Sequence, residues 1–432
     1  MRSSRALPPA VLVTALALVL AACAGGEDED GSEESTSTQD DETPSDDENP
    51  SDDEPADPAA LDAHVAAVSD LGAELAATAE DESLVVSPAS AATMLAILAA
   101  GAEGETLAEL ETLLGGGSSD VLASIGDLRA VRADLEVDPA AGDLDPWPDS
   151  PVLHLADQVA VREGVTPGDA WLTSVEGLGA EVVEASPDEL PGLLDEWVAL
   201  HTGGLVEESA ITPDASTGLV VQDAVLLHAS FEPRFSGSAT EDLPFTLADG
   251  SEVTVPTMRA ERPLPWAETE VATATSLDLE GGLDVQVVLP AEGTAPSELT
   301  AEDWNALDDA LTSGDEALVD LGLPRADLAT TTNLMSALPG LGAESFADGG
   351  GELGGIFEGA FVDEAVQQAT LEVTEQGVVA AAVSETDAAG AIPPPPETRE
   401  LIVDRPYALR VVDGETGWVL VHAVVADPRG EG

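Results

Sequence analysis

The chain has 432 residues and a formal net charge of −73, and all 13 of its basic residues are arginine. Such a charge repels nucleic acid and anionic polysaccharide, which excludes both as partners. Hydrophobic residues make up 44% of the chain and aromatic residues only 3%, so the core must be built mainly from Leu, Val and Ala. The acidity has two readings, a biased genome or adaptation to high salt. A melting temperature that rises steeply with molar salt would indicate the second, and a flat one would remove it.

The N-terminus has the pattern of an export signal. Arg2 and Arg5 precede an apolar run from Val11 to Leu20, which is shorter than the roughly 20 residues of a spanning helix. Small residues then lead to Cys23, the only cysteine. This combination resembles the lipobox of bacterial lipoproteins. It implies a signal peptide at 1–22, a lipid on Cys23 and an extracellular protein anchored to the outer face of the cell membrane. An ordinary signal peptide with an incidental cysteine is the alternative.

Residues 23–58 are predicted to form an acidic, disordered linker. The stretch from Glu27 to Asp57 holds 16 acidic residues and no basic one, mixed with Ser, Thr, Gly and Pro. It cannot bury enough apolar surface to fold, and its like charges repel one another and extend it. We expect it to separate the anchor from a folded domain at 59–432. An acidic tail that binds a partner is the other reading.

From Ala59 the composition becomes that of a globular domain. Apolar residues recur at helical spacing and predict one amphipathic helix (Leu61, Val65, Val68, Leu71 and Leu75). A short buried strand at 84–86 and an Ala- and Leu-rich helix at 89–100 follow. Thr106, with Glu109 three residues later, has the pattern of a capping box, so a further helix is expected to start at Thr106.

Apolar strands characterise the second half of the domain. They are predicted at 219–227, 285–289 and 418–425. Because helices gather in the first quarter and strands in the last half, the pattern favours the α+β class over alternating βαβ units. No internal repeat and no second linker divides 59–432.

The chain lacks the common catalytic and metal-binding motifs. It contains no G-x-S-x-G, H-E-x-x-H, P-loop or G-x-G-x-x-G sequence. The histidines are scattered, without a partner at ligand spacing, so each is expected to be a surface or packed residue (His64, His154, His201, His228 and His422). We therefore expect no metal, no cofactor and no enzymatic activity. An extracellular enzyme without a recognisable motif is the least supported alternative.

Six segments of the domain, in chain order, resemble the serpin family. They are LVVSPASAATMLAILAAGAEGETLAELETLLG (84–115), LDEWVALHTGGLVEESA (194–210), LVVQDAVLLHASFEPRF (219–235), LPFTLADGSEVTVPTM (243–258), QATLEVTEQGVVAAA (368–382) and DRPYALRVVDGETGWVLVHAVVADP (404–428). The resemblance covers 59–430. It implies an α+β serpin-like fold with three β-sheets, eight or nine helices and an exposed reactive-centre loop near the C-terminus. It also implies a monomeric inhibitor that traps a serine protease by inserting its cleaved loop into the main sheet.

The resemblance also assigns the residues of that loop. The hinge corresponds to Glu375, Gly377, Val378, Ala380, Ala381 and Ala382. The family's spacing from Glu375 places the reactive bond between Ala391 and Ile392. A small apolar residue before the cut suits an elastase-like or subtilisin-like protease. A trypsin-like enzyme finds no Arg or Lys between Arg325 and Arg399.

The loop sequence suits a strand with one uncharged face. If Val378 points inward, alternate residues share its face, and these are Ala380, Ala382, Ser384, Thr386 and Ala388. Glu385 and Asp387 then fall on the outward face, which matters because a buried unpaired carboxylate is costly. A strand followed by an Ala-rich surface loop is the alternative reading.

Three positions depart from the family pattern. The usual Asn, Trp and His correspond here to Asp223, Phe231 and Gln367. With Ser87 and Ser90, Asp223 and Gln367 are expected to form a shutter-like polar cluster behind the main sheet. These changes leave the expected fold intact but put the tuning of loop insertion in doubt. A non-inhibitory serpin-fold binding or scaffold protein on the cell surface is therefore the second functional hypothesis.

Overall fold

The computed structural model describes residues 55–137, 150–213, 217–314, 316–347, 351–362, 365–378 and 398–429. Several predicted features lie outside these ranges: the signal peptide, Cys23, nearly all of the acidic linker, Ala380, Ala381, Ala382 and the bond between Ala391 and Ile392. None of the helices within the ranges combines the length and apolar character that crossing a membrane requires.

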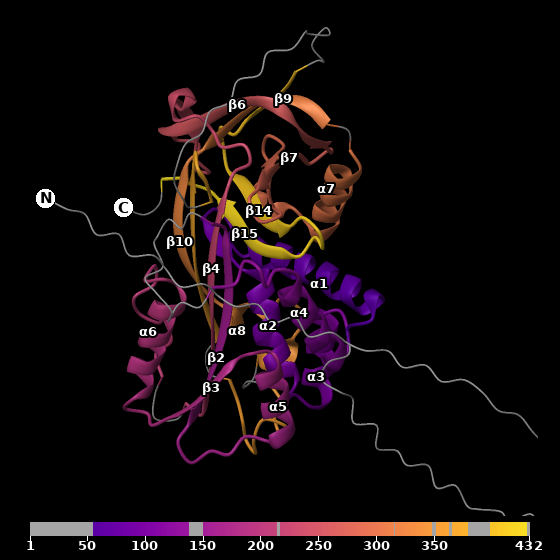
Figure 1. Ribbon diagram of the computed structural model, residues 1–432, viewed down its shortest axis with the longest axis vertical. Coiled ribbons are helices and arrows are strands. Elements are labelled where there is room, and N and C mark those ends of the chain that lie inside the picture. The colour runs from indigo at the N-terminus through magenta and orange to yellow at the C-terminus, as the bar shows by residue number, and fades with distance from the viewer. Residues whose placement is uncertain are drawn as a thin grey trace, which may run out of the picture. The chain divides into compact units, whose positions relative to one another are not determined.

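Eight α-helices lie in the described residues, most of them in the first half of the chain (Figure 1). They are α1 (Pro58–Ala77), α2 (Pro88–Ala99), α3 (Gly104–Leu113), α4 (Ser118–Val131), α5 (Asp169–Gly177), α6 (Leu190–His201), α7 (Ala301–Ser313) and α8 (Leu334–Ala337). Helix α2 is buried along its whole length, because small and aliphatic side chains cover every face of it.

Helix α3 begins at Gly104, so the predicted start at Thr106 is wrong. Gly104 has a φ of 57°, which lets the chain turn into the helix two residues earlier. Thr106 Oγ1 instead accepts a hydrogen bond from the backbone N–H of Glu352 (2.8 Å), and the Glu109 carboxylate accepts one from that of Ser345 (3.1 Å). Both side chains therefore hold a distant segment in place.

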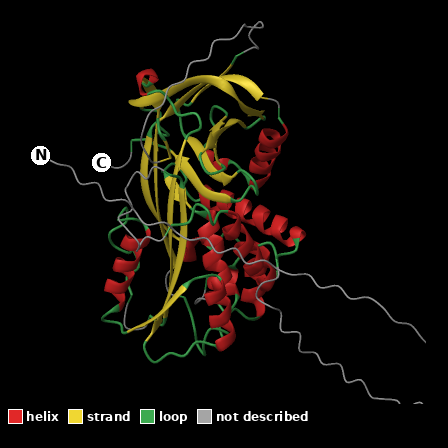
Figure 2. Cartoon of the chain, viewed as in Figure 1, coloured by secondary structure: helices red, strands yellow, loops and turns green. Residues whose placement is uncertain are grey.

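A six-stranded sheet forms the long axis of the fold (Figure 2). Its order is β10-β11-β12-β4-β2-β3. The strands are β2 (Val152–Arg162), β3 (Glu181–Ala185), β4 (Leu219–Ser230), β10 (Ala326–Asn333), β11 (Ala365–Thr374) and β12 (Gly377–Val378). Helix α6 packs on one face, where its Leu190 and Leu194 contact Ala160 and Val220. Helix α2 lies against the opposite face, beside β4.

The remaining strands form a nine-stranded sheet in the order β1-β15-β14-β8-β7-β6-β9-β13, with β5 beside β6. They are β1 (Leu84–Val86), β5 (Glu241–Thr246), β6 (Glu252–Glu268), β7 (Ala272–Leu279), β8 (Leu283–Pro290), β9 (Glu316–Pro324), β13 (Arg399–Ile402), β14 (Tyr407–Asp413) and β15 (Val419–Val425). The long strand β6 pairs with β9 over most of its length and with β7 only at its end. It thus joins two hydrogen-bonded sheets, which accounts for the expected three. The predicted α+β class is confirmed.

Strands β14 and β15 meet α1 and α7 around Arg410, which is fully buried. Its guanidinium donates to Ser69 Oγ (3.2 Å) and Asp308 Oδ2 (3.3 Å), and lies 3.7 Å from the centroid of the Trp304 ring. His422 packs edge-on against the same ring. Burial, and then the charge of Arg410, hold the pKa of His422 well below its usual value. His422 is therefore neutral, and the positive charge of this cluster lies on Arg410, which pairs with Asp308.

Replacing Arg410 with Ala should lower the free energy of unfolding by about 3 kcal/mol or more, because it leaves Asp308 and Ser69 without their buried donor. Urea denaturation measures the loss. Arg429→Ala is the matched control, since Arg429 is half exposed and pairs with the neighbouring Asp427. The control should cost far less, because water and salt screen an exposed ion pair. Equal losses in both variants would contradict the role given to Arg410.

Candidate functional site

The six-stranded sheet is interrupted between β4 and β11. These two strands run parallel, yet they pair with each other at one end only. The pairs there are Ala365↔Val221 and Val366↔Gln222. Beyond them, residues 223–228 of β4 and 367–372 of β11 border a gap. Within the described residues, no strand lies between these two stretches.

Strand β12 occupies the other end of this gap. Val378 pairs with Ala229 of β4 on one side and with Val373 of β11 on the other. Its side chain is 3% exposed and belongs to the main hydrophobic core, so Val378 points inward. The same number of residues, six on each strand, separates β12 from the paired end.

A cavity of about 310 Å³ opens at the gap. It reaches from the strands that border the gap to the core behind them. Its lining comes from β4 (Val225, Leu226 and Leu227), β11 (Ala369, Thr370, Leu371 and Glu372), β10 (Asp327, Leu328 and Ala329), β12 (Val378), the segment after α6 (Leu205) and the residues behind the sheet (Val85, Val86, Ser87 and Val421). The interruption in the ladder is thus accompanied by empty volume.

Gly377 lets the chain reverse between β11 and β12. Its φ is 152°, a backbone conformation that favours glycine. A Cβ atom on Gly377 would lie 2.2 Å from the carbonyl oxygen of Ala229 and 2.5 Å from the Cα of Ser230. Only a glycine therefore allows β12 to lie this close to β4.

Glu375 fixes the start of the turn. Its carboxylate accepts hydrogen bonds from Arg325, with Nε at 3.0 Å, and from Thr240. Burial raises the pKa of Glu375, but the hydrogen bonds from Arg325 and Thr240 together outweigh burial and hold it below its usual value. Phe231 lies at the same end of the gap. Its backbone N–H donates to the Gln376 carbonyl (2.9 Å), and its buried ring packs edge-on against the ring of Phe235.

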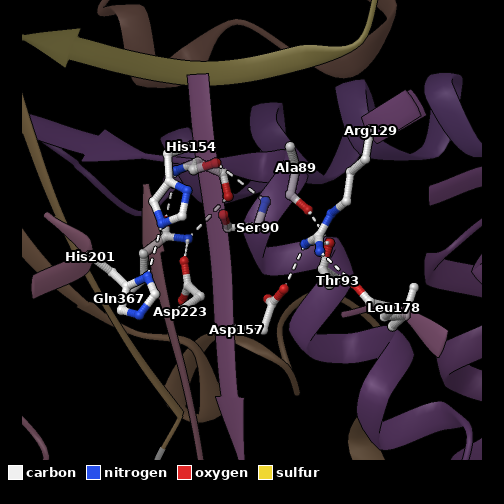
Figure 3. Close-up of polar contacts among 11 residues, drawn as sticks. Ala89, Ser90, Thr93, Arg129, His154, Asp157, Leu178, His201, Asp223 and Gln367 are labelled. Carbon is white, nitrogen blue, oxygen red and sulfur yellow. Dashed lines mark hydrogen bonds and ion pairs between the residues drawn. The ribbon is translucent and has the colours of Figure 1, made fainter. Parts of the chain in front are cut away.

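Gln367 connects the paired end of the gap to α2 (Figure 3). Its Oε1 accepts from the backbone N–H of Ser87 (2.7 Å), so its Nε2 is the donor to Asp223 Oδ2 (3.2 Å). Ser87 Oγ accepts from the backbone N–H of Ser90 (3.2 Å). The four residues assigned to the shutter-like cluster are thus in contact and buried. The bond between Gln367 and Asp223 joins β11 to β4.

Two further members of this cluster were not predicted. Asp157 of β2 lies directly opposite Asp223 in the β2–β4 ladder, and Arg129 of α4 bonds Asp157 (Nη2 to Oδ2, 2.6 Å; Figure 3). Burial, and then the charge of Asp157, raise the pKa of Asp223 to about 7. Among 86 acidic residues no pair of carboxylates is conspicuous in the sequence. The sequence offered one hint: with only 13 arginines for 86 acidic residues, any arginine is worth examining as the partner of a buried carboxylate.

The opposite face of the sheet carries a histidine pair. His154 of β2 and His201 of α6 lie 2.8 Å apart (Nε2 to Nδ1), and the His201 ring stacks on Trp197 (Figure 3). Folding therefore brings these two histidines, which are far apart in the sequence, together as packed residues between β2 and α6. Within the described residues, no group of three or more His, Cys, Asp or Glu side chains is arranged to hold a metal ion.

The segment after α6 also reaches across to β11. The backbone N–H of Ala210 donates to Gln368 Oε1 (2.8 Å), and Gln368 Nε2 donates to the Glu208 carbonyl (3.2 Å). Helix α6 is thus attached to β2 through its histidine and to β11 through this segment. The helix lies over β2 and β4 on one side of the gap, and the segment that follows it reaches β11 on the other side.

Gly377→Ala should displace β12 and cost roughly 2–4 kcal/mol of unfolding free energy, because the new Cβ cannot coexist with the Ala229 carbonyl. Gly164→Ala is the matched control. Gly164 also has a positive φ (86°), but a Cβ there meets no atom within 4 Å. It should cost about 1–2 kcal/mol, the dihedral penalty alone. Urea denaturation of both variants tests this, and a Gly377→Ala loss no larger than the control would contradict the packing argument.

Known proteins resemble this chain over most of its length. A protein-family model described as serpin (serine protease inhibitor) matches residues 66–428. The probable serpin E3 of Danio rerio is 28% identical over 343 residues, which cover 72% of this chain and 79% of that protein. An uncharacterized serpin-like protein of Methanosarcina acetivorans is 24% identical over 371 residues, which cover 82% and 83%.

Solved structures show the same fold. The native state of tengpin, a thermophilic serpin, superposes with a TM-score of 0.71 at 22% identity, covering 84% of this chain and 94% of tengpin. Human thyroxine-binding globulin complexed with thyroxine gives 0.71 at 20% identity, covering 85% and 100%. Because the family model spans most of the sequence and the fold agrees with it, this chain belongs to the serpin family of serine protease inhibitors.

Proposed function

We propose that this serpin inhibits its protease as a suicide substrate. In this proposal, the protease cleaves the segment after β12, and the cleaved segment enters the gap between β4 and β11 before the acyl-enzyme is hydrolysed. Insertion of a cleaved loop is the known mechanism of inhibitory serpins. The observation that supports it here is the gap itself, with β12 already in place at one end.

The registers on the two sides of the gap agree. Val378 pairs with Ala229 and with Val373. An antiparallel strand that continued from Val378 would place residues 379–384 beside 228–223 of β4 and, equally, beside 372–367 of β11. The next residues would meet the pairs that β4 already forms with β11. One strand can therefore satisfy both edges, and deeper insertion must separate β4 from β11.

The side chains of residues 379–387 suit a strand with one face towards the core and the other towards water. Because Val378 points into the core, Ala380, Ala382 and Ser384 would share its inward face. Glu385 and Asp387 would face away from the core, where water can reach their charges. Because Val378 faces inward, the even-numbered residues after it would also face inward, and none of those up to residue 388 is charged.

Insertion would release enough free energy to trap a protease. About a dozen residues would each gain ladder hydrogen bonds, worth roughly 0.5–1.5 kcal/mol net per bond, and side-chain burial would add to this. The sum is on the order of 10 kcal/mol, comparable with the whole stability of an ordinary domain. Such a driving force can distort an attached protease if insertion outruns deacylation.

For the target we propose an elastase-like or subtilisin-like serine protease. We propose that it cleaves this chain at the bond between Ala391 and Ile392. The support comes from the sequence, which offers small apolar residues there and no Arg or Lys between Arg325 and Arg399. A non-inhibitory binding protein is the second candidate, supported by Asp223, Phe231 and Gln367 in place of the family's usual residues. Thyroxine-binding globulin shows that this fold also occurs in a complex with a small molecule.

Val378→Arg should convert the inhibitor into a substrate, because the first inward residue would carry a charge into the core. Incubation with subtilisin or elastase and a denaturing gel measures this: the native chain should give a covalent complex, and the variant only a cleaved product. Ala382→Arg tests the same face of the proposed strand at a second position. Val379→Arg, with the opposite parity, is the control and should still form the complex.

A covalent complex that persists in both inward-face variants would refute the insertion mechanism. Cleavage of the native chain without any complex would favour the non-inhibitory binding protein. Mass spectrometry of the products identifies the bond that is cut.

We also propose that the protein is exported and held at the outer face of the cell membrane by a lipid on Cys23. The support is the sequence of the first 23 residues. Growth of the producing cells with a radioactive fatty acid should label the protein, and Cys23→Ser should abolish the label. An unlabelled native chain would end this proposal.

A further inference from the structure

The contact between Asp157 and Asp223 places two carboxyl groups side by side in the interior. They are directly opposed in the antiparallel β2–β4 ladder, where facing side chains lie about 5 Å apart at Cβ. Asp157 is 4% exposed and Asp223 is 5% exposed. Two buried carboxylates this close cannot both ionise without a strong repulsion.

The groups packed around the pair compensate one negative charge. From α4, Arg129 bonds Asp157. From β11 and α2 come only neutral side chains, among them Gln367 and Ser90, which hydrogen-bond Asp223. The second oxygen of Asp223, Oδ1, is buried and has no hydrogen-bond partner among the described residues. The site thus holds one more carboxylate than it can neutralise.

A proton resolves this imbalance, and Asp223 is the residue that takes it. Burial and the neighbouring Asp157 raise the pKa of Asp223 to about 7, against the weaker opposing effect of the hydrogen bonds from Gln367 and Ser90. Near neutrality Asp223 therefore exchanges a proton with solvent.

This proton lies where the two strands must part. The Gln367–Asp223 bond crosses from β11 to β4 one residue beyond the last pair of the ladder, Val366↔Gln222. Separation of the strands there removes Gln367 and admits water. Hydration relieves the burial that favours the protonated form, so Asp223 ionises as the strands part.

We propose that a proton held by Asp223, beside the buried carboxyl group of Asp157, keeps β4 and β11 together, and that opening of the sheet at this end releases it. The inference rests on the proposed function only in treating this opening as the step that precedes deep insertion. The carboxyl pair is a property of this chain, because Asp223 stands where the resemblance leads one to expect Asn.

The direction of the pH effect follows from linkage. The closed sheet binds the proton more tightly than the open sheet, so acid favours the closed form. As pH rises from the ordinary value of an aspartate towards the raised value in the closed sheet, opening becomes easier by up to about tenfold per pH unit. Above that raised value, the effect levels off. Acid therefore holds the sheet closed, and neutral pH permits it to open.

Hydrogen–deuterium exchange of the uncut protein tests this without any protease. Exchange in peptides that cover β11 is measured between pH 5 and pH 8 for the native chain and for Asp223→Asn, compared at each pH so that the intrinsic exchange rate cancels. The variant keeps an acceptor for Gln367 but cannot titrate. Protection of the native chain relative to the variant should fall by several-fold or more from pH 5 to pH 7 and then stay constant.

Asp284→Asn is the matched control. Burial, with the charges of Asp278 and Asp413, raises the pKa of Asp284 to about 6, but Asp284 lies on β8 in the other sheet. Its loss should leave the pH profile of β11 unchanged. Asp157→Asn removes the opposing charge and should move the profile to lower pH.

A ratio of native to Asp223→Asn protection that is constant with pH would overturn the proposal. The proposal would also be overturned if Asp157→Asn left the pH profile of β11 protection unchanged. Neither result depends on protease trapping. A chain that traps no protease but shows the predicted profile would refute the proposed function and keep the inference.

Discussion

The interruption between β4 and β11 is the constraint on which the rest of the structure depends. A sheet normally completes its ladder, because backbone N–H and C=O groups are strong donors and acceptors that need partners. Here the ladder is formed at one end, wedged apart by Val378 at the other, and backed by empty volume between them. Three other features of the site hold this arrangement: the glycine turn, the hydrogen bonds to Glu375 and the polar cluster at Gln367.

The few basic residues of this acidic chain help to hold those places. Arg410, Arg129 and Arg325 each join segments far apart in sequence, and each bonds a carboxylate that is wholly or partly buried. A lone charge in a low-dielectric interior is costly, so such pairs fix the relative position of the elements that carry them. With only 13 cations for 86 acidic side chains, a buried carboxylate without its own arginine is an expected outcome, and Asp223 is one.

Much of the fold could be predicted from the sequence, because it rests on local pattern and on six segments in the family's order. The buried helix α2, the inward direction of Val378 and the glycine turn all follow from side-chain size and alternation. What the sequence did not reveal depends on pairing between distant strands. Asp157 meets Asp223 only through the β2–β4 register, and Arg325 meets Glu375 only once β10 and β11 are adjacent. Thr106 and Glu109 matched the capping-box pattern, yet both side chains hydrogen-bond a distant segment, at Glu352 and Ser345.

The attachment of α6 has a consequence for timing. His201 of this helix bonds His154 of β2, which pairs with β4, and the segment after the helix bonds Gln368 of β11, so the two contacts lie on opposite sides of the gap. If the segment after β12 inserts as proposed, these contacts, which the uncut protein already has, must rearrange as β4 and β11 separate. In that mechanism they would raise the activation barrier to insertion more than they would change its driving force. Under the proposed mechanism, tighter attachment of α6 would therefore both prolong the life of the uncut form and slow the trapping of a protease.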